Sequence, residues 1–150
     1  MFGDLRELYQ EVILDHSKAP RNFGHPPETN RIALGNNPLC GDRLWIFLTF
    51  EDGVVVDAAF EGQGCAISVA SASLMTEAVK GKSEAHVRDL FARFHRLMTE
   101  DDSEAEAANL DKLAVFAGVR EFPVRVKCAT LAWHTLAAAM DGQADVSTES

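Results

Sequence analysis

Three cysteines and one aspartate are the residues best suited to chemistry in this 150-residue chain. Cys40 and Asp42 lie on either side of Gly41, so a tight loop can direct a thiolate and a carboxylate toward one point. Cys65 follows a glycine, and Cys128 opens the last predicted helix. Three sulfur donors and one carboxylate make a complete tetrahedral set for Zn²⁺, which accepts sulfur, nitrogen and oxygen ligands. These four residues are therefore the candidate metal ligands.

The spacing of these residues leaves other interpretations open. A free cysteine is commonly a small buried hydrophobic side chain, and the cysteines lie 25 and 63 residues apart, unlike paired C-x-x-C ligands. All three nevertheless fall beside loops or predicted helix starts rather than within apolar stripes, which favours ligation. Asp42 has an alternative role as a turn residue. A cysteine hydrolase also stays open, although nothing in the sequence places a histidine base beside a thiol.

Other motifs are incomplete or scattered. No H-x-E and no second C-x-x-C accompany the Cys40 loop, which removes a zinc deaminase. A phosphate-binding loop has little support, because the glycines before Cys65 lack the third glycine of a dinucleotide-binding turn. Arg125 and Lys127 precede Cys128 at a predicted helix start, where basic groups are mildly unfavourable, and this favours a role near a thiolate-rich centre. For the histidines we expect surface or capping roles: His16, His25, His86, His95 and His134.

Length and composition predict one domain over residues 1–150. A hydrophobic content of 47% is enough for a core of its own. An odd number of cysteines argues against a secreted disulfide framework and favours a reducing compartment. The sequence has no signal-peptide pattern and no run of 18 apolar residues. We therefore expect a cytoplasmic protein that neither leaves the cell nor spans a membrane.

The charge balance narrows the choice of partner. The chain has 14 Lys and Arg against 23 Asp and Glu, a formal net charge of −9. Such a chain is repelled by nucleic-acid phosphates and by anionic membrane surfaces. A protein or a metal ion is the expected partner.

Apolar periodicity predicts the elements that would position the site. An amphipathic helix over residues 4–16 is followed by an irregular, proline-rich connector over 18–30, which Phe23 would pin. Three strands follow, over residues 31–35, 44–50 and 54–61. We expect the second to be buried on both faces and joined to the third by an Asp52-Gly53 hairpin turn.

The second half of the chain is predicted to be mostly helical. Cys65 would lie in the first turn of a helix over residues 65–79, where the helix dipole favours a thiolate. A second helix reaches Met98, and a short one over 110–116 would be broken at Gly118. The last predicted helix covers 124–140, and the polar tail over 142–150 is predicted to be frayed.

Several segments together resemble the U-type iron–sulfur assembly proteins, in the same order over residues 5–140. The segments are 8–9 (LY), 15–16 (DH), 20–24 (PRNFG), 37–42 (NPLCGD), 60–68 (FEGQGCAIS) and 127–129 (KCA). The scaffold branch of that superfamily usually has a histidine where this chain has Lys127. Residues 99–118 resemble an insertion that is typical of the SufU branch. Both features indicate the SufU branch.

The resemblance implies an α+β fold in which a small antiparallel sheet of about three strands packs on a layer of helices. It also implies zinc held by Cys40, Asp42, Cys65 and Cys128. Sulfur would come from a PLP-dependent cysteine desulfurase of the SufS type. A side chain of that partner would replace Cys40 on zinc, and Cys40 would then accept the persulfide sulfur. Asp42 would be able to move with the Cys40 loop.

Two functions and a fallback follow. The first is a zinc-dependent sulfurtransferase that passes sulfur on to downstream Suf assembly proteins, with Arg125 and Lys127 supporting Cys40. The second is a non-enzymatic scaffold that carries a transient iron–sulfur cluster on the same cysteines. The absence of a histidine before Cys128 argues against the scaffold function. A purely structural zinc domain is the fallback.

Overall fold

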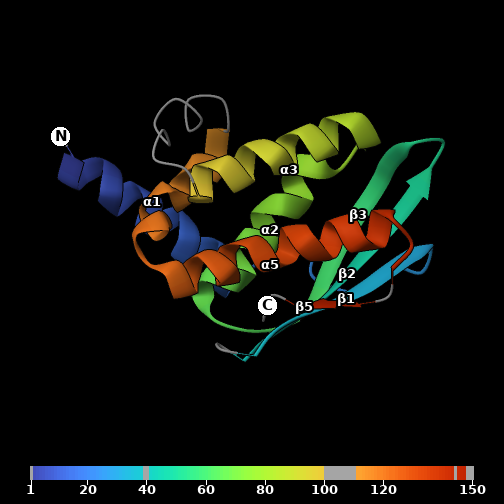
Figure 1. The fold of residues 1–150 in the computed structure, drawn as a ribbon, viewed down its shortest axis with the longest axis horizontal. Coiled ribbons are helices and arrows are strands. Elements are labelled where there is room, and N and C mark those ends of the chain that lie inside the picture. The colour runs from blue at the N-terminus through green and yellow to red at the C-terminus, as the bar shows by residue number, and fades with distance from the viewer. Residues whose placement is uncertain (1, 39–40, 100–110, 144, 148–150) are drawn as a thin grey trace.

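The computed structural model describes residues 2–38, 41–99, 111–143 and 145–147, with side chains except at 2–9, 111–112, 120–121 and 145–147. Within them, helices α2 and α5 pack on one face of a sheet with strand order β4-β3-β2-β1-β5 (Figure 1). This arrangement confirms the predicted α+β fold. The elements are α1 (Phe2–Lys18), β1 (Arg31–Asn37), β2 (Asp42–Glu51), β3 (Val54–Gln63), α2 (Ala66–Val79), β4 (Lys82–Ser83), α3 (Glu84–Thr99), the 3₁₀ helix η1 (Asp111–Glu121), α5 (Pro123–Met140) and β5 (Asp145–Ser147).

The centre of the sheet is an antiparallel meander of β1, β2 and β3, the three strands that the sequence predicted. Asp52 and Gly53 join β2 to β3 with φ angles of 51° and 75°. Positive φ at both positions suits an Asp-Gly hairpin turn, which matches the twist of the strands. The predicted turn is confirmed.

Strand β2 is buried on both faces only over its middle. Leu44, Ile46 and Leu48 face the helices and are fully buried, whereas Trp45 on the opposite face is exposed. Phe47, on that same outer face, is buried because the ring of His25 stacks on it, with 4.1 Å between ring centroids. The expectation of burial along the whole strand was therefore wrong at its first residues.

The connector before β1 crosses the sheet and closes part of its edge. Gly24 N–H donates to the Phe60 carbonyl at 2.9 Å, and Phe60 N–H donates to the Asn22 carbonyl at 3.0 Å. The ring of Phe23 lies edge-on to that of Phe60, with centroids 5.2 Å apart. Phe23 thus pins the connector, as its position between prolines predicted.

The chain after α5 corrects the prediction of a frayed tail. Residues 145–147 form β5, which pairs in parallel with β1 over Leu34, Gly35 and Asn36. An edge strand has a row of unpaired N–H and C=O groups that another segment can satisfy. Because β1 would otherwise be that edge, the polar tail gains a partner that its composition does not reveal.

Helix α5 lies directly on β1 and α2. A Cβ added at Gly35 would collide with the side chain of Thr135, so only glycine lets this strand approach the helix so closely. Ser71 Oγ donates to the Ala129 carbonyl at 2.5 Å, which ties α2 to α5. Small side chains on α2 therefore bring two helices together beside the sheet.

One buried histidine joins α1 to α2. His16 is 3% exposed, and its Nδ1 lies 2.7 Å from Ser73 Oγ. The same hydroxyl accepts the backbone N–H of Arg21 at 2.9 Å. The surface role expected for His16 was wrong, because serine on α2 leaves room for the ring and supplies it with a polar partner.

The segment before α5 is a 3₁₀ helix rather than a short helix broken at Gly118. Leu113, Phe116 and Val119 are buried and recur every three residues. A 3₁₀ helix has three residues per turn, so this spacing places all three side chains on one face. The element consequently continues through Gly118 to Glu121. Residues 100–110 of the predicted insertion lie outside the described residues.

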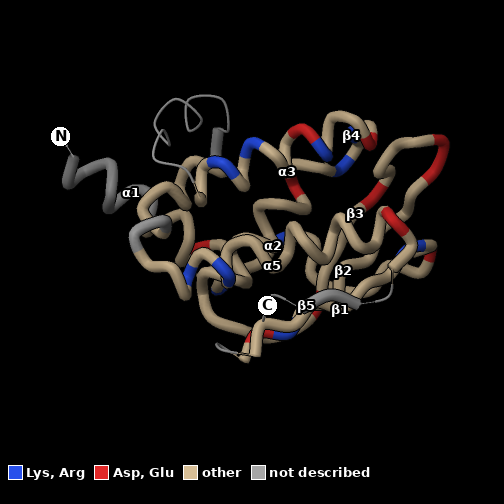
Figure 2. The backbone as a smooth tube through the Cα atoms, viewed as in Figure 1, with Lys and Arg blue, Asp and Glu red and all other residues tan. Residues whose placement is uncertain are grey.

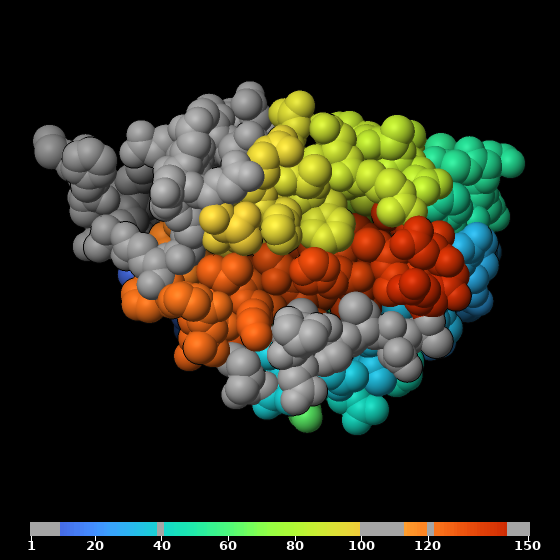
Figure 3. Space-filling model, in the orientation of Figure 1, coloured from blue at the N-terminus to red at the C-terminus, as the bar shows by residue number. Residues whose placement is uncertain are grey.

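An aromatic core, defined here as Phe94, Phe116 and Trp133, joins α3, η1 and α5. The Phe94 and Trp133 rings stack with centroids 4.9 Å apart, and Phe116 meets Phe94 edge-on at 5.8 Å. In the space-filling view α5 runs between α3 and the sheet (Figure 3). Acidic and basic residues are interspersed along α3 (Figure 2), and none of the described helices is long and apolar enough to cross a membrane.

Candidate metal centre

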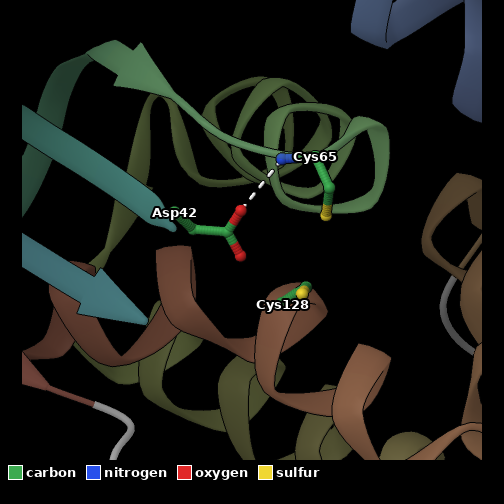
Figure 4. Close-up of side chains that lie close together, drawn as sticks. All are labelled: Asp42, Cys65 and Cys128. Carbon is green, nitrogen blue, oxygen red and sulfur yellow. Dashed lines mark hydrogen bonds between the residues drawn. The ribbon is translucent and has the colours of Figure 1, made fainter. Parts of the chain in front are cut away.

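Asp42, Cys65 and Cys128 meet where β2, α2 and α5 converge (Figure 4). One carboxylate oxygen and the two sulfur atoms all lie within 4.8 Å of one another. The three residues come from positions far apart in the sequence, so only the packing of the two helices on the sheet brings them together. Three of the four predicted ligands therefore occupy one place.

Asp42 is the first residue of β2 and is 2% exposed. It lies directly opposite Asn37 in the β1–β2 pairing. Its Oδ1 accepts the Cys65 backbone N–H at 2.9 Å, and its Oδ2 accepts from Asn37 Nδ2 at 3.2 Å. Because both oxygens are hydrogen-bonded and the backbone is paired, Asp42 is fixed in the sheet. These contacts oppose the expected movement of Asp42 with the loop, which stays a prediction.

Cys65 is the N-cap of α2, one residue before the helix begins and not within its first turn as predicted. The pKa of the Cys65 thiol is lowered to about 6, chiefly by a hydrogen bond with Cys128 and also by the amides of Ser68 and Ile67 at the helix start. Burial and the charge of Asp42 act in the opposite direction. Cys65 is thus poised to be a thiolate near neutral pH, as ligation and nucleophilic chemistry both require.

The approach of Asp42 to the start of α2 depends on Gly64. A Cβ at that position would lie 2.5 Å from Asp42 Oδ1 and 2.6 Å from Ser68 Oγ. Contacts that short are not tolerated, so a side chain there would push the carboxylate away from Cys65. The glycine before the cysteine is therefore part of the site.

Cys128 lies in the second turn of α5 rather than at its start, because the helix begins at Pro123. The residue is fully buried. Its Sγ receives a hydrogen bond from Asn37 Nδ2 at 3.5 Å and lies 3.7 Å from the Val124 carbonyl. Proline is favoured in the first turn because its missing N–H costs nothing there, which explains why the helix begins earlier than its cysteine.

Cys40 lies outside the described residues, so its place as the fourth ligand stays a prediction. In the sequence it stands between Asn37 and Asp42, which pair at the end of the β1–β2 hairpin. Gly41 has a φ of 72°, a left-handed conformation that glycine adopts readily. The chain therefore turns sharply between the two paired residues.

The two predicted basic residues differ in their relation to the site. The pKa of the exposed Arg125 is raised, chiefly by attraction to the Cys65 thiolate and then by a hydrogen bond with Cys128. Lys127 is half-buried on α5, and no hydrogen bond or ion pair joins its ammonium group to the described part of the chain. The structure thus relates Arg125 to the sulfur atoms and shows no such interaction for the Lys127 side chain among the described residues.

Two polar residues of the site had no predicted role. Asn37 is fully buried and contacts both Asp42 and Cys128. Ser68 is fully buried beside Gly64 and Asp42, and its hydroxyl has no hydrogen-bond partner among the described residues. A signal for Asn37 existed, because residues at the two ends of a hairpin loop face each other. Finding it required the exact strand ends, which periodicity does not give.

Comparison with known proteins gives consistent matches over most of the chain. The model of the family described as NifU-like N terminal domain matches residues 8–129, a range that includes Asp42, Cys65 and Cys128. The zinc-dependent sulfurtransferase SufU of Bacillus subtilis (strain 168) is 41% identical over 134 residues, covering 89% of this chain and 90% of that protein. The iron–sulfur cluster assembly scaffold protein IscU of Streptococcus pyogenes serotype M1 is 39% identical over 141 residues, covering 94% and 87%.

A solved structure has the same fold. It belongs to a protein of Fervidobacterium islandicum AW-1 described as a candidate iron–sulfur cluster assembly scaffold for the SUF system. Its TM-score is 0.79 at 33% identity, and the superposition covers 89% of this chain and 97% of that one. The arrangement of sheet and helices around the three side chains is thus shared with a protein of similar length.

Proposed function

The chain belongs to the family of NifU-like N-terminal domains, and we propose that it is a zinc-dependent sulfurtransferase in iron–sulfur cluster assembly. It would accept persulfide sulfur from a PLP-dependent cysteine desulfurase of the SufS type. The observation that carries this proposal is the convergence of two cysteine sulfurs and a buried carboxylate, with Cys40 between the paired residues Asn37 and Asp42. The likeness to a relative named as a zinc-dependent sulfurtransferase supports it.

The donor set suits zinc. Zn²⁺ binds cysteine sulfur at about 2.3 Å and carboxylate oxygen at about 2.0–2.2 Å, so neighbouring ligands of a tetrahedral ion lie roughly 3.5–3.8 Å apart. The three donors here lie within 4.8 Å of one another, close to that spacing. Asp42, Cys65 and Cys128 would hold the ion, with Cys40 as the fourth ligand. Bound zinc would keep the thiols deprotonated at neutral pH.

Cys40 is the proposed sulfur acceptor. Its thiolate attacks the terminal sulfur of the partner's cysteine persulfide, and a new S–S bond forms on Cys40. The S–S bond of the donor breaks, and the donor cysteine leaves as a thiolate with the electron pair. This is the chemistry of thiol–disulfide exchange and needs no external oxidant or reductant.

The other residues of the site would hold the metal ion and the incoming sulfur. Cys65 and Cys128 stay in place as ligands, because both are anchored in helices and Cys128 is fully buried. Arg125 is exposed beside the sulfur atoms, where its positive charge favours an incoming anionic persulfide. Lys127 is assigned a weaker role in holding the partner protein.

A scaffold that assembles an iron–sulfur cluster on the same cysteines is the second candidate. The 39% identity to a relative named as an iron–sulfur cluster assembly scaffold favours it. The scaffold branch usually has a histidine at the position of Lys127, and this difference argues against the scaffold function. A transient cluster would occupy the same ligands as zinc, so the two functions differ in which metal the purified protein retains.

We also propose the compartment in which the protein acts and the proteins that receive the sulfur. Neither Cys65 nor Cys128 forms a disulfide with a described residue, and we propose that the protein acts in the reducing cytoplasm. Sulfur accepted on Cys40 would pass to downstream Suf assembly proteins. These proteins would have to approach the end of the molecule where β2, α2 and α5 meet.

The test measures metal content and desulfurase turnover together, on wild type and Cys40→Ser. We expect about one zinc per wild-type chain and an increase in sulfide production by the cognate cysteine desulfurase, which Cys40→Ser abolishes. Pro38→Ala, an exposed change in the same loop, serves as control and should retain the stimulation. Full stimulation by Cys40→Ser would refute sulfur transfer. A labile iron–sulfur chromophore in protein purified without added iron would favour the scaffold.

A further inference from the structure

We propose that Asn37 is a positioning residue that holds Asp42 and Cys128 in ligating geometry while Cys40 changes partners. This inference rests on the proposed function and deepens it. It assigns a role to a side chain that is not itself a predicted ligand. The role explains how one ligand can leave the centre without releasing the others.

The contacts of Asn37 connect two ligands from different elements. Its Nδ2 lies 3.2 Å from Asp42 Oδ2 and 3.5 Å from Cys128 Sγ. An amide nitrogen carries two hydrogen atoms, so one can be donated to each ligand. Asn37 is fully buried and Asp42 is 2% exposed, so water competes little for these bonds. One side chain thus bridges the sheet and α5 at the metal centre.

The Asp42 carboxylate fixes the orientation of the amide. An ionised carboxylate only accepts hydrogen bonds, so the NH₂ group must face it. A flipped amide would place its oxygen against that anionic group. In the orientation observed, Asn37 Oδ1 is buried and has no hydrogen-bond partner among the described residues. The amide therefore satisfies the ligands at the expense of its own acceptor, which is unusual for a buried side chain.

The position of Asn37 in the hairpin links its two hydrogen bonds to the loop that contains Cys40. Asn37 is the last residue of β1 and lies opposite Asp42, the first residue of β2. Residues 38–41, which include Cys40, connect these two ends. Because Asn37 ties Asp42 to Cys128, the base of the loop is attached to α5. Cys40 can then leave the centre while Asp42, Cys65 and Cys128 keep their relative positions.

Hydrogen bonds to metal ligands from neighbouring side chains orient those ligands, and removing one typically weakens metal binding by about 10–100-fold. We therefore expect Asn37→Leu, which keeps a similar volume but has no donor, to bind zinc about 10–100-fold more weakly than wild type. Zinc affinity would be measured on the full chain by competition with a chromophoric chelator.

A second measurement separates positioning from general stability. Co²⁺ bound in place of zinc reports the ligand geometry through its visible absorption, and we expect this spectrum to change in Asn37→Leu. The matched control is Asn30→Ala, because the Asn30 amide likewise makes two hydrogen bonds but lies outside the metal centre. It accepts from Phe50 N–H at 2.8 Å and donates to the Phe50 carbonyl at 2.9 Å. This control should bind zinc within about twofold of wild type and leave the cobalt spectrum unchanged.

The outcomes are distinct. Zinc affinity within about twofold of wild type and an unchanged cobalt spectrum in folded Asn37→Leu would overturn the proposal. If Asn37→Leu does not fold, the same criterion is applied to Asn37→Ser, which is smaller and has a single O–H donor. Wild-type protein that binds zinc but accepts no sulfur would refute the proposed function and leave the Asn37 result valid. Sulfur transfer by wild type with no effect of Asn37→Leu on zinc would refute the Asn37 role alone.

Discussion

The first two turns of α5 and the remainder of the same helix are stabilised by different interactions. The first turns bring Cys128 and Arg125 to a polar cluster with Asp42 and Cys65. The later turns place Trp133 in the aromatic core with Phe94, where the rings stack. Cys128 and Trp133 are both fully buried, but Cys128 is buried beside a carboxylate and Trp133 beside an aromatic ring.

This difference separates stability from function along a single helix. Burying an aromatic side chain is favourable by itself, because apolar surface leaves water. Burying a carboxylate and thiols is costly unless hydrogen bonds or a cation compensate. The aromatic core should therefore determine whether the chain folds, and the polar cluster should determine what the folded chain binds. Three substitutions test this division, from the largest expected effect on the free energy of unfolding to the smallest.

The largest effect is expected for Trp133→Ala. Trp133 is fully buried against Phe94, and truncating a buried Trp or Phe costs about 3–5 kcal/mol of unfolding free energy. Denaturant unfolding of zinc-free protein would measure it, with Trp45→Ala as the matched control because Trp45 is 38% exposed. The control should lose much less. Equal losses in both variants would contradict the importance of the aromatic core.

An intermediate effect is expected for Asp42→Ala. In zinc-free protein two hydrogen bonds to the carboxylate are lost, each worth about 1 kcal/mol net, and relief from burying its charge offsets part of this loss. Zinc retention should fall clearly, because a predicted ligand is removed. Metal analysis after dialysis against a chelator measures retention, and Asp57→Ala, at a surface ion pair with Lys80, is the control. Undiminished zinc in Asp42→Ala would remove Asp42 from the ligands.

The smallest effect is expected from the titration of His134, beside the aromatic core. Burial, and to a lesser degree the charge of His95, lowers the pKa of His134 below its ordinary value of 6.5. Between these two pKa values the unfolded chain binds a proton that the folded chain does not. The contribution to stability is therefore complete above pH 6.5 and is lost as the pH falls through the folded pKa.

The measurement is the free energy of unfolding of zinc-free protein at several pH values that span about one unit on either side of the ordinary histidine pKa. The wild type should lose stability more steeply than His134→Gln as the pH falls. His86→Gln, at an exposed position, is the control and should follow the wild type. Parallel curves for wild type and His134→Gln would mean that the protonation of His134 does not affect folding.

Local patterns were enough to predict most elements. Alternating side chains identified β3, aromatic and β-branched content identified β2, and the Asp52-Gly53 pair identified the turn between them, because these features depend on neighbouring residues alone. The 3₁₀ helix was missed because residues 110–116 were predicted to form a short helix broken at Gly118. The pairing of residues 145–147 with β1 was missed because an edge strand accepts a partner of almost any composition.

The sequence by itself determined which residue types were available for a metal centre and the order in which the family motifs occur. Cysteine and aspartate beside glycines indicated the donors, because ligand chemistry is a property of each side chain. The role of Cys40 still rests on that sequence information.

Only the tertiary structure decided that Asp42 is fixed in the sheet, that Cys128 lies in the second turn of α5, and that Asn37 connects them. These relations depend on the pairing of β1 with β2 and on the packing of α5 against them. The packing of α5 brings Cys128 to Asn37, which is far from it in the chain, and no local pattern encodes the distance between them.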